Sequence, residues 1–126
     1  MRVLVCGGRD LDRNAAHSWL DRYAEDEIAM ELRAFSLSIG VVIHGGARGA
    51  DQGGADWGQS IGAQVLEYKA NWKKHGKAAG PIRNRIMLEQ GKPDVVLALP
   101  GGRGTENMVR QAEGAGVPVI RAKIYD

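Results

Sequence analysis

Three short segments of this 126-residue chain combine glycine with arginine, and this combination suits the binding of phosphate. Glycine lets the backbone approach a ligand closely and adopt positive φ angles. The planar guanidinium of arginine binds phosphate or carboxylate through two parallel hydrogen bonds. The segments are Gly7-Gly8-Arg9-Asp10, His44-Gly45-Gly46-Ala47-Arg48-Gly49-Ala50-Asp51 and Pro100-Gly101-Gly102-Arg103-Gly104-Thr105.

Each segment follows an apolar run and is predicted to lead into the start of a helix. The N–H groups at a helix start have no acceptor within the helix, so they favour an anion. Thr105 would add a hydroxyl donor or cap the helix that follows. The alternative is that the glycines only form tight turns. For a single pair such as Gly7-Gly8, tight turns explain the glycines as well as ligand binding does. They explain three such segments together less well.

Acidic and further basic residues accompany these segments. Asp10 and Asp51 could compensate converging positive charge or cap the following helices, and Asp51 could instead accept hydrogen bonds from a ribose. Arg83 and Arg85 are predicted to open a helix just before the fourth strand. We expect Arg83 and Arg48 to pair with phosphate, and either Asp51 or Asn84 to contact the ribose.

The stretch 71–81 is basic, punctuated by glycine and proline, and predicted to be a long loop. Long loops in compact domains are usually functional or disordered. Trp72 offers a surface on which a base could stack, and Lys74 or Lys77 could reach a phosphate. The alternative is a solvated basic loop with Trp72 in the core. Aromatic residues among basic ones also suit single-stranded nucleic acid, but the net charge of +2 argues against that as the main role.

No pattern in the sequence indicates a metal site or a bound cofactor. The three histidines lack the spacing of metal ligands. The P-loop motif is absent, and so is the dinucleotide pattern G-x-G-x-x-G after the first strand. His44 ends a strand beside a glycine segment, where it could serve the site or be buried and hydrogen-bonded. Cys6, the single cysteine, is interpreted as a small buried hydrophobe rather than a catalytic thiol.

Length and composition predict one soluble domain over residues 1–126. Hydrophobic residues make up 44% and charged residues 25%, as in ordinary globular proteins. One cysteine excludes a disulfide within the chain and favours a reducing cytoplasm. No apolar run is long enough for a membrane helix, and the start of the chain runs directly into a predicted strand, so we expect no signal peptide and no membrane partner.

The elements that must position these residues alternate between strand and helix. Predicted strands are Val3–Cys6, Val41–His44, Gln64–Tyr68 (the weakest), Val95–Leu99 and Val117–Ile120. Predicted helices are Asn14–Phe35 (either bent or divided in two), Asp51–Ile61, Ile82–Glu89 and Glu106–Gly114. Continuous apolar strands fit a parallel sheet covered on both faces. We therefore predict a Rossmann-like three-layer α/β/α fold with about five mostly parallel strands in the order 3-2-1-4-5. This order brings the glycine segments to one edge.

The glycine segments together with Trp72-Lys73-Lys74-His75-Gly76-Lys77-Ala78-Ala79-Gly80-Pro81-Ile82-Arg83-Asn84 resemble the SLOG superfamily. The nearest branch is its small single-domain proteins related to YspA and YpsA. The resemblance covers nearly the whole chain, except for an expansion around residues 24–38. It implies a Rossmann-like fold that binds a nucleotide or a nucleotide-derived ligand. Relatives are often dimers, and the apolar face of residues 106–114 could form such an interface.

The enzyme branch of the superfamily, the LOG phosphoribohydrolases, splits the base from a nucleoside monophosphate. The resemblance implies that Arg83 is the catalytic arginine of that branch, with Met87 four residues on. The catalytic glutamates would fall at Asn107 and Met108, which cannot act as a general acid. We therefore favour a ligand-binding or sensing domain. The alternatives are an N-glycosidic hydrolase, in which Asp10, Asp51 or Glu106 takes over, and a protein that binds single-stranded nucleic acid.

Overall fold

Five parallel strands form the centre of the fold in a computed structural model that describes residues 1–124. The strand order is β3-β2-β1-β4-β5, and every neighbouring pair is parallel. The predicted order is therefore confirmed, and the switch in strand order falls between β1 and β4. The strands are β1 (Arg2–Cys6), β2 (Val41–His44), β3 (Gln64–Glu67), β4 (Val95–Ala98) and β5 (Val119–Arg121).

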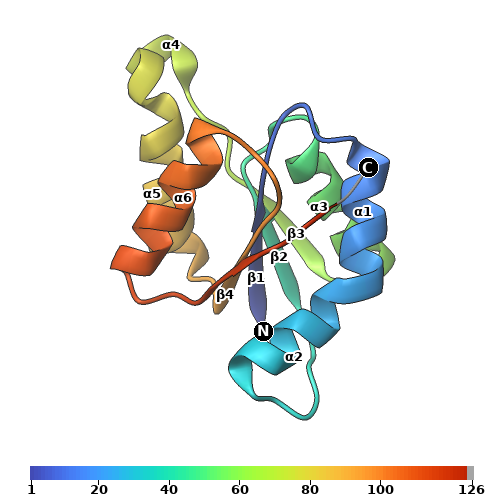
Figure 1. The fold of residues 1–126 in the computed structure, drawn as a ribbon. Helices are drawn as coiled ribbons and strands as arrows, with labels where there is room; N and C mark the ends of the chain where they lie inside the picture. The colour runs from blue at the N-terminus through green and yellow to red at the C-terminus, as the bar shows by residue number, and fades with distance from the viewer. Residues whose placement is uncertain (125–126) are drawn as a thin grey trace.

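Helices cover both faces of the sheet, which confirms the three-layer α/β/α architecture (Figure 1). One face carries α1 (Arg13–Trp19), the π-helical segment η1 (Leu20–Ala24), α2 (Glu25–Leu32) and α3 (Ala50–Ser60). The other face carries α5 (Ala79–Gly91) and α6 (Arg103–Gly114), with the short α4 (Trp72–His75) and the 3₁₀ turn η2 (Gly76–Ala78) leading into α5. Buried apolar side chains fill the space between the sheet and each helical layer.

The first helical region is one continuous helix over residues 13–32, with a π-helical segment in its middle. The wider π turn shifts the phase of the buried face, which explains why the apolar spacing predicted a bent or divided helix. Leu20, Ala24 and Ile28 are all fully buried as a result. The helix ends at Arg33, whose φ is 52°. Phe35, the last residue of the predicted helix, lies beyond this end and is fully exposed.

The stretch 71–81 is mostly helical, so the prediction of a long loop is wrong. The side chain of Asn71 accepts a hydrogen bond from the backbone N–H of Lys74 and caps α4. Pro81 lies in the first turn of α5, where its missing N–H costs no hydrogen bond. Arg83 and Arg85 consequently lie beyond the helix opening, in its second turn.

Two smaller expectations also need correction. The last strand begins at Val119, two residues later than predicted. The apolar face of α6, proposed as a dimer interface, packs against the sheet, and Met108, Val109 and Ala112 are buried there. That face is therefore not available to a second copy. Within residues 1–124, every helix is too short or too polar to cross a bilayer.

Candidate functional site

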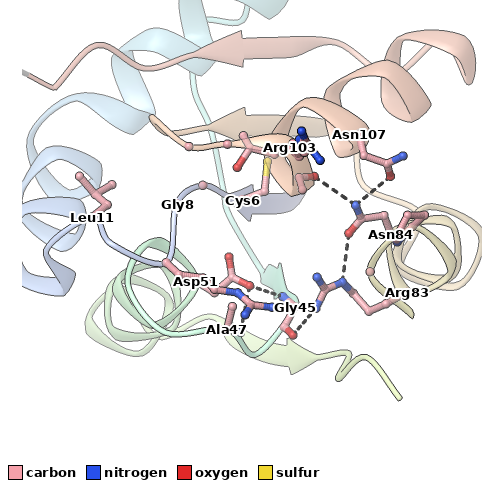
Figure 2. Close-up of a pocket in the computed structure, with 18 of the residues that line it drawn as sticks. Cys6, Gly8, Leu11, Gly45, Ala47, Asp51, Arg83, Asn84, Arg103 and Asn107 are labelled. Atoms are coloured by element: carbon pink, nitrogen blue, oxygen red, sulfur yellow. Dashed lines mark hydrogen bonds between the residues drawn. The ribbon is translucent and has the colours of Figure 1, made fainter. Parts of the chain in front are cut away.

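A cavity of about 860 Å³ opens at the carboxyl edge of the sheet, where the loops after β1, β2 and β4 meet α5 (Figure 2). This is the edge at which open α/β sheets bind ligands. The structure brings together most of the predicted site residues. Those lining the cavity are Gly7, Gly8, Arg9, Asp10, Gly45, Asp51, Trp72, Lys77, Arg83, Asn84, Pro100, Gly101, Gly102, Gly104 and Thr105.

The loops after β1 and β4 pack directly against each other beneath the cavity. The backbone N–H of Gly8 donates to the carbonyl oxygen of Pro100 at 2.8 Å. A Cβ placed on Gly101 would lie 2.6 Å from the Gly8 nitrogen and would overlap the hydroxyl of Thr105. The two loops can therefore approach this closely only because glycine occupies position 101.

The N-terminus of α6 points its free N–H groups toward the cavity. The helix begins at Arg103, and the first N–H with an acceptor in this turn is that of Glu106, which donates to the Gly102 carbonyl. The N–H groups of Arg103, Gly104 and Thr105 have no acceptor within the helix. Thr105 is buried but does not cap the helix, so the capping interpretation of this residue is wrong. This helix start can bind an anion.

Arg83 lies in the wall of the cavity with its guanidinium already anchored. Its Nη1 donates to the carbonyl oxygen of Gly45 at 2.5 Å, and its Nε donates to Oδ1 of Asn84 at 3.0 Å. A Cβ on Gly45 would overlap the guanidinium, so a larger residue at position 45 would displace Arg83 from its present position. Burial lowers the pKa of Arg83, and the charge of Asp51 opposes this effect. Arg85 instead points to solvent and pairs with Glu89 at 3.9 Å.

Asp51 is a buried carboxylate on the cavity wall, with 5% of its surface exposed. Its Oδ2 accepts hydrogen bonds from the backbone N–H groups of Gly45 at 3.1 Å and Ala47 at 3.2 Å. Burial raises its pKa to about 6, although the bond from Ala47 and the charge of Arg83 act in the opposite direction. Gly49, not Asp51, is the N-cap residue of α3. The carboxylate therefore orders the loop after β2 and does not cap a helix.

Three predicted site residues lie outside the cavity lining. Arg48 is exposed and forms an ion pair with Asp10 at 3.2 Å. Gly46 adopts a positive φ beside the side chain of Glu67. Gly49 has a φ of 75° and packs against the carbonyl oxygen of Gly8. These glycines therefore shape the loop rather than line the site.

Trp72 lies at the rim of the cavity, not in the core. About half of its surface is exposed, and the guanidinium carbon of Arg9 lies 5.4 Å from the centre of its ring. Cation–π contact at this distance is attractive. Lys77 lies nearby in η2 and also lines the cavity. Trp72 thus presents an aromatic surface beside the positive side chains.

One face of α6 contributes three lining residues that are absent from the predicted ligand-binding set. Arg103, Asn107 and Arg110 are spaced four and three residues apart, which places them on the same side of a helix. This spacing is the sequence signal that could have identified them. Oδ1 of Asn107 accepts from Nδ2 of Asn84 at 3.1 Å and from Nε2 of Gln111 at 2.8 Å. Asn107, one of the two positions at which the resemblance places a catalytic glutamate, is therefore part of a hydrogen-bonded network of side-chain amides.

The other candidate acids near α6 do not reach the cavity. Glu106 forms two hydrogen bonds of 2.9 Å with Arg121, and this partner lowers the pKa of the carboxyl. Met108, the other position at which a catalytic glutamate would fall, is buried in the core. Among the acids proposed for hydrolysis, Asp51 and Asp10 line the cavity, and only Asp51 is buried.

Cys6 and His44 are both buried at the ends of their strands. Burial raises the pKa of the Cys6 thiol far above neutrality, so the thiol stays protonated and is a poor nucleophile. Nδ1 of His44 accepts a hydrogen bond from the N–H of Gly46 at 3.1 Å, and burial lowers its pKa. Of the two alternatives for His44, a role in the site or a buried and hydrogen-bonded position, the structure shows the second. In residues 1–124, no group of three side chains could hold a metal ion.

Comparison with known proteins identifies the family. A family model described as the YspA, cpYpsA-related SLOG family matches residues 1–75. The Gene 61 protein of Mycobacterium phage D29 is 39% identical over 127 aligned residues, and the alignment covers 94% of each chain. The matched segment contains β1, β2 and β3 with the glycine loops after β1 and β2. This chain, with its glycine loops at the carboxyl edge of a 3-2-1-4-5 sheet, belongs to the YspA, cpYpsA-related SLOG family.

Proposed function

We propose that residues 1–126 act as one domain that binds a nucleotide or nucleotide-derived phosphate ligand in the cavity at the carboxyl edge of the sheet. One observation carries the proposal: the free N–H groups at the start of α6 and the side chains of Arg103 and Arg83 all lie around one cavity. A helix N-terminus and arginine fork geometry both favour phosphate.

The remaining parts of a nucleotide have matching surfaces in the same cavity. Trp72 provides an exposed aromatic ring on which a base can stack. Oδ1 of Asp51 accepts no hydrogen bond from residues 1–124, so it is available to a ribose hydroxyl. Together these groups support a ligand that combines phosphate, sugar and base, rather than phosphate alone.

A thermal-shift screen tests the proposal. Ligand that binds only the folded state raises the melting temperature with concentration. We expect nucleoside mono- and diphosphates to raise it, and Arg83→Ala to reduce the shift given by a diphosphate strongly. Arg85→Ala is the matched control because Arg85 lies on the same helix, is exposed and does not line the cavity. Its shift should equal that of the wild type.

Three outcomes would contradict the proposal. One is the absence of any shift with every nucleotide at millimolar concentration. Another is an equal loss of shift in Arg83→Ala and Arg85→Ala, which would mean that only overall charge matters. A third is binding of oligonucleotides that grows with their length and falls steeply with salt, while mononucleotides do not bind. That result would favour single-stranded nucleic acid as the ligand.

Hydrolysis of a nucleoside monophosphate is a second candidate function, favoured by one observation. Burial raises the pKa of Asp51 to about 6, which is close to neutral pH. A general acid works best when its pKa is near the pH at which the enzyme operates. In this reaction water adds to the ribose carbon, the bond to the base breaks and the base takes up a proton.

The release of free base from nucleoside monophosphates measures this activity directly. If Asp51 donates the proton, Asp51→Asn is expected to lower the rate by about 100-fold or more. Asp10→Asn, at the exposed carboxyl that also lines the cavity, is the matched control and should leave the rate nearly unchanged. No base release, or release unaffected by Asp51→Asn, would contradict this candidate.

A further inference from the structure

The cavity has more positive charge than the protein neutralises. Five cationic side chains that line it form no ion pair within residues 1–124: Arg9, Lys77, Arg83, Arg103 and Arg110. Two carboxylates line the cavity. Asp10 already pairs with Arg48, and Asp51 is held by two backbone N–H groups. Cations around one cavity repel each other, so a ligand with more than one negative charge is favoured over one with a single charge.

Four of these cations form two groups around the cavity. Arg103 begins α6 and Arg110 lies two turns further along the same helix, and we call this pair the α6 subsite. Arg83, anchored on Gly45, lies across the cavity from Arg103 (Figure 2). Arg9 lines the same cavity, with its guanidinium carbon 5.4 Å from the centre of the Trp72 ring, and its charge contributes to lowering the pKa of Arg83. We call this pair the Arg9–Arg83 subsite.

Each subsite favours an anion for its own reason. At the α6 subsite, free N–H groups and the helix dipole add to the charge of Arg103. At the Arg9–Arg83 subsite, two guanidinium groups share Asp51 as their nearby carboxylate. The cavity volume of about 860 Å³ lies near the upper end of the range for small-molecule sites. There is therefore space for a ligand that reaches both subsites at once.

We infer that the ligand of this site carries two linked phosphoryl groups, one held at the α6 subsite and the other between Arg9 and Arg83. The inference rests on the proposed function and specifies its ligand as a nucleoside diphosphate or a molecule built on one. A monophosphate occupies one subsite and leaves the other group of cations uncompensated.

Matched pairs of nucleotides test the inference without knowledge of the base. Dissociation constants are measured by calorimetry for the mono- and diphosphate of each common nucleoside. For the best-binding base, we expect the diphosphate to bind at least about tenfold more tightly. Arg9→Ala should bring this ratio close to one and change monophosphate affinity little. Arg103→Ala should weaken both ligands and preserve most of the ratio.

Arg85→Ala is the matched control, because Arg85 is an exposed cation on α5 that pairs with Glu89, and neither residue lines the cavity. Its ratio should equal that of the wild type. Equal affinity of the wild type for mono- and diphosphate would overturn the inference and leave the proposed function standing. A ratio that Arg9→Ala and Arg85→Ala lower equally would also overturn it. No binding of any nucleotide would instead overturn the proposed function.

Discussion

Replacing Gly101 with alanine is expected to destabilise the protein by about 3 kcal/mol and to abolish ligand binding. The added Cβ would meet the Gly8 nitrogen at 2.6 Å and the Gly7 carbonyl carbon at 2.9 Å. Both are backbone atoms, so the loops after β1 and β4 must separate to make room. Overpacking of this kind typically costs about 1–3 kcal/mol, and rigid surroundings bring it to the upper end. Denaturant unfolding measures the loss.

Gly104→Ala is the control for this prediction. No atom lies within 4 Å of a Cβ at position 104, which is in the first turn of α6. Alanine is favoured over glycine in a helix by up to about 1 kcal/mol. We expect unchanged or slightly higher stability, together with weaker ligand binding, because Gly104 lines the cavity. Equal stability losses in Gly101→Ala and Gly104→Ala would show that the close packing at Gly101 is not the cause.

Asp51→Asn is expected to stabilise the protein above pH 7 by about 1–3 kcal/mol while weakening ligand binding. The pKa of Asp51 is raised to about 6 in the folded state from 3.8, so the folded state binds the proton more tightly. Stability contributed by protonated Asp51 is present below pH 4 and is lost as the pH rises through 6. A shift of about two units corresponds to about 3 kcal/mol. Asparagine never carries the buried charge, and its oxygen can still accept from Gly45 and Ala47.

The difference between wild type and Asp51→Asn isolates this contribution from other titrating groups. Asp56 and Glu106 have pKa values lowered by their arginine partners, so their contributions are lost as the pH falls. Both groups are present in the wild type and in the variant, so their contributions cancel in the difference between the two unfolding free energies. Unfolding free energies at pH 4.5, 6 and 8 should differ little at the lowest pH and most at the highest. A difference that is constant with pH, or a variant that is less stable at pH 8, would contradict the prediction.

A carboxylate that lowers stability at neutral pH is typical of a binding site. The loss of a hydrogen bond between a charged group and a ligand costs about 1.5–3 kcal/mol, so ribose-containing ligands should bind Asp51→Asn about 10- to 100-fold more weakly. Higher stability with lower affinity in the same variant would identify Asp51 as a functional rather than a structural residue.

The strand order and most of the cavity could be predicted from sequence because local patterns determine them. Apolar runs mark the buried parallel strands, and glycine loops after β1, β2 and β4 must meet at one edge once the order is 3-2-1-4-5. The π-helical segment 20–24 was visible only as a shift in spacing. The helix at 72–75 was missed because its glycine and proline neighbours are typical of loops.

Contacts between distant residues could not be predicted in the same way. Nothing local in the sequence pairs Arg48 with Asp10, or Glu106 with Arg121, since each pair forms only after the loops and strands have packed. The amide network of Asn84, Asn107 and Gln111 likewise joins two helices that are separate in the chain. Such contacts decide which polar side chain faces the cavity and which is already occupied.

The anchoring of Arg83 has a kinetic consequence. A free arginine side chain carries about 2 kcal/mol of rotamer entropy. Because Gly45 and Asn84 already hold the guanidinium, most of that entropy is lost during folding and not when the ligand arrives. Preorganisation of this kind strengthens binding, and among variants of one site affinity changes appear mainly as slower dissociation. We therefore expect the proposed ligand to dissociate more slowly from this site than from one with a free arginine, because the order of Arg83 is already supplied when α5 folds.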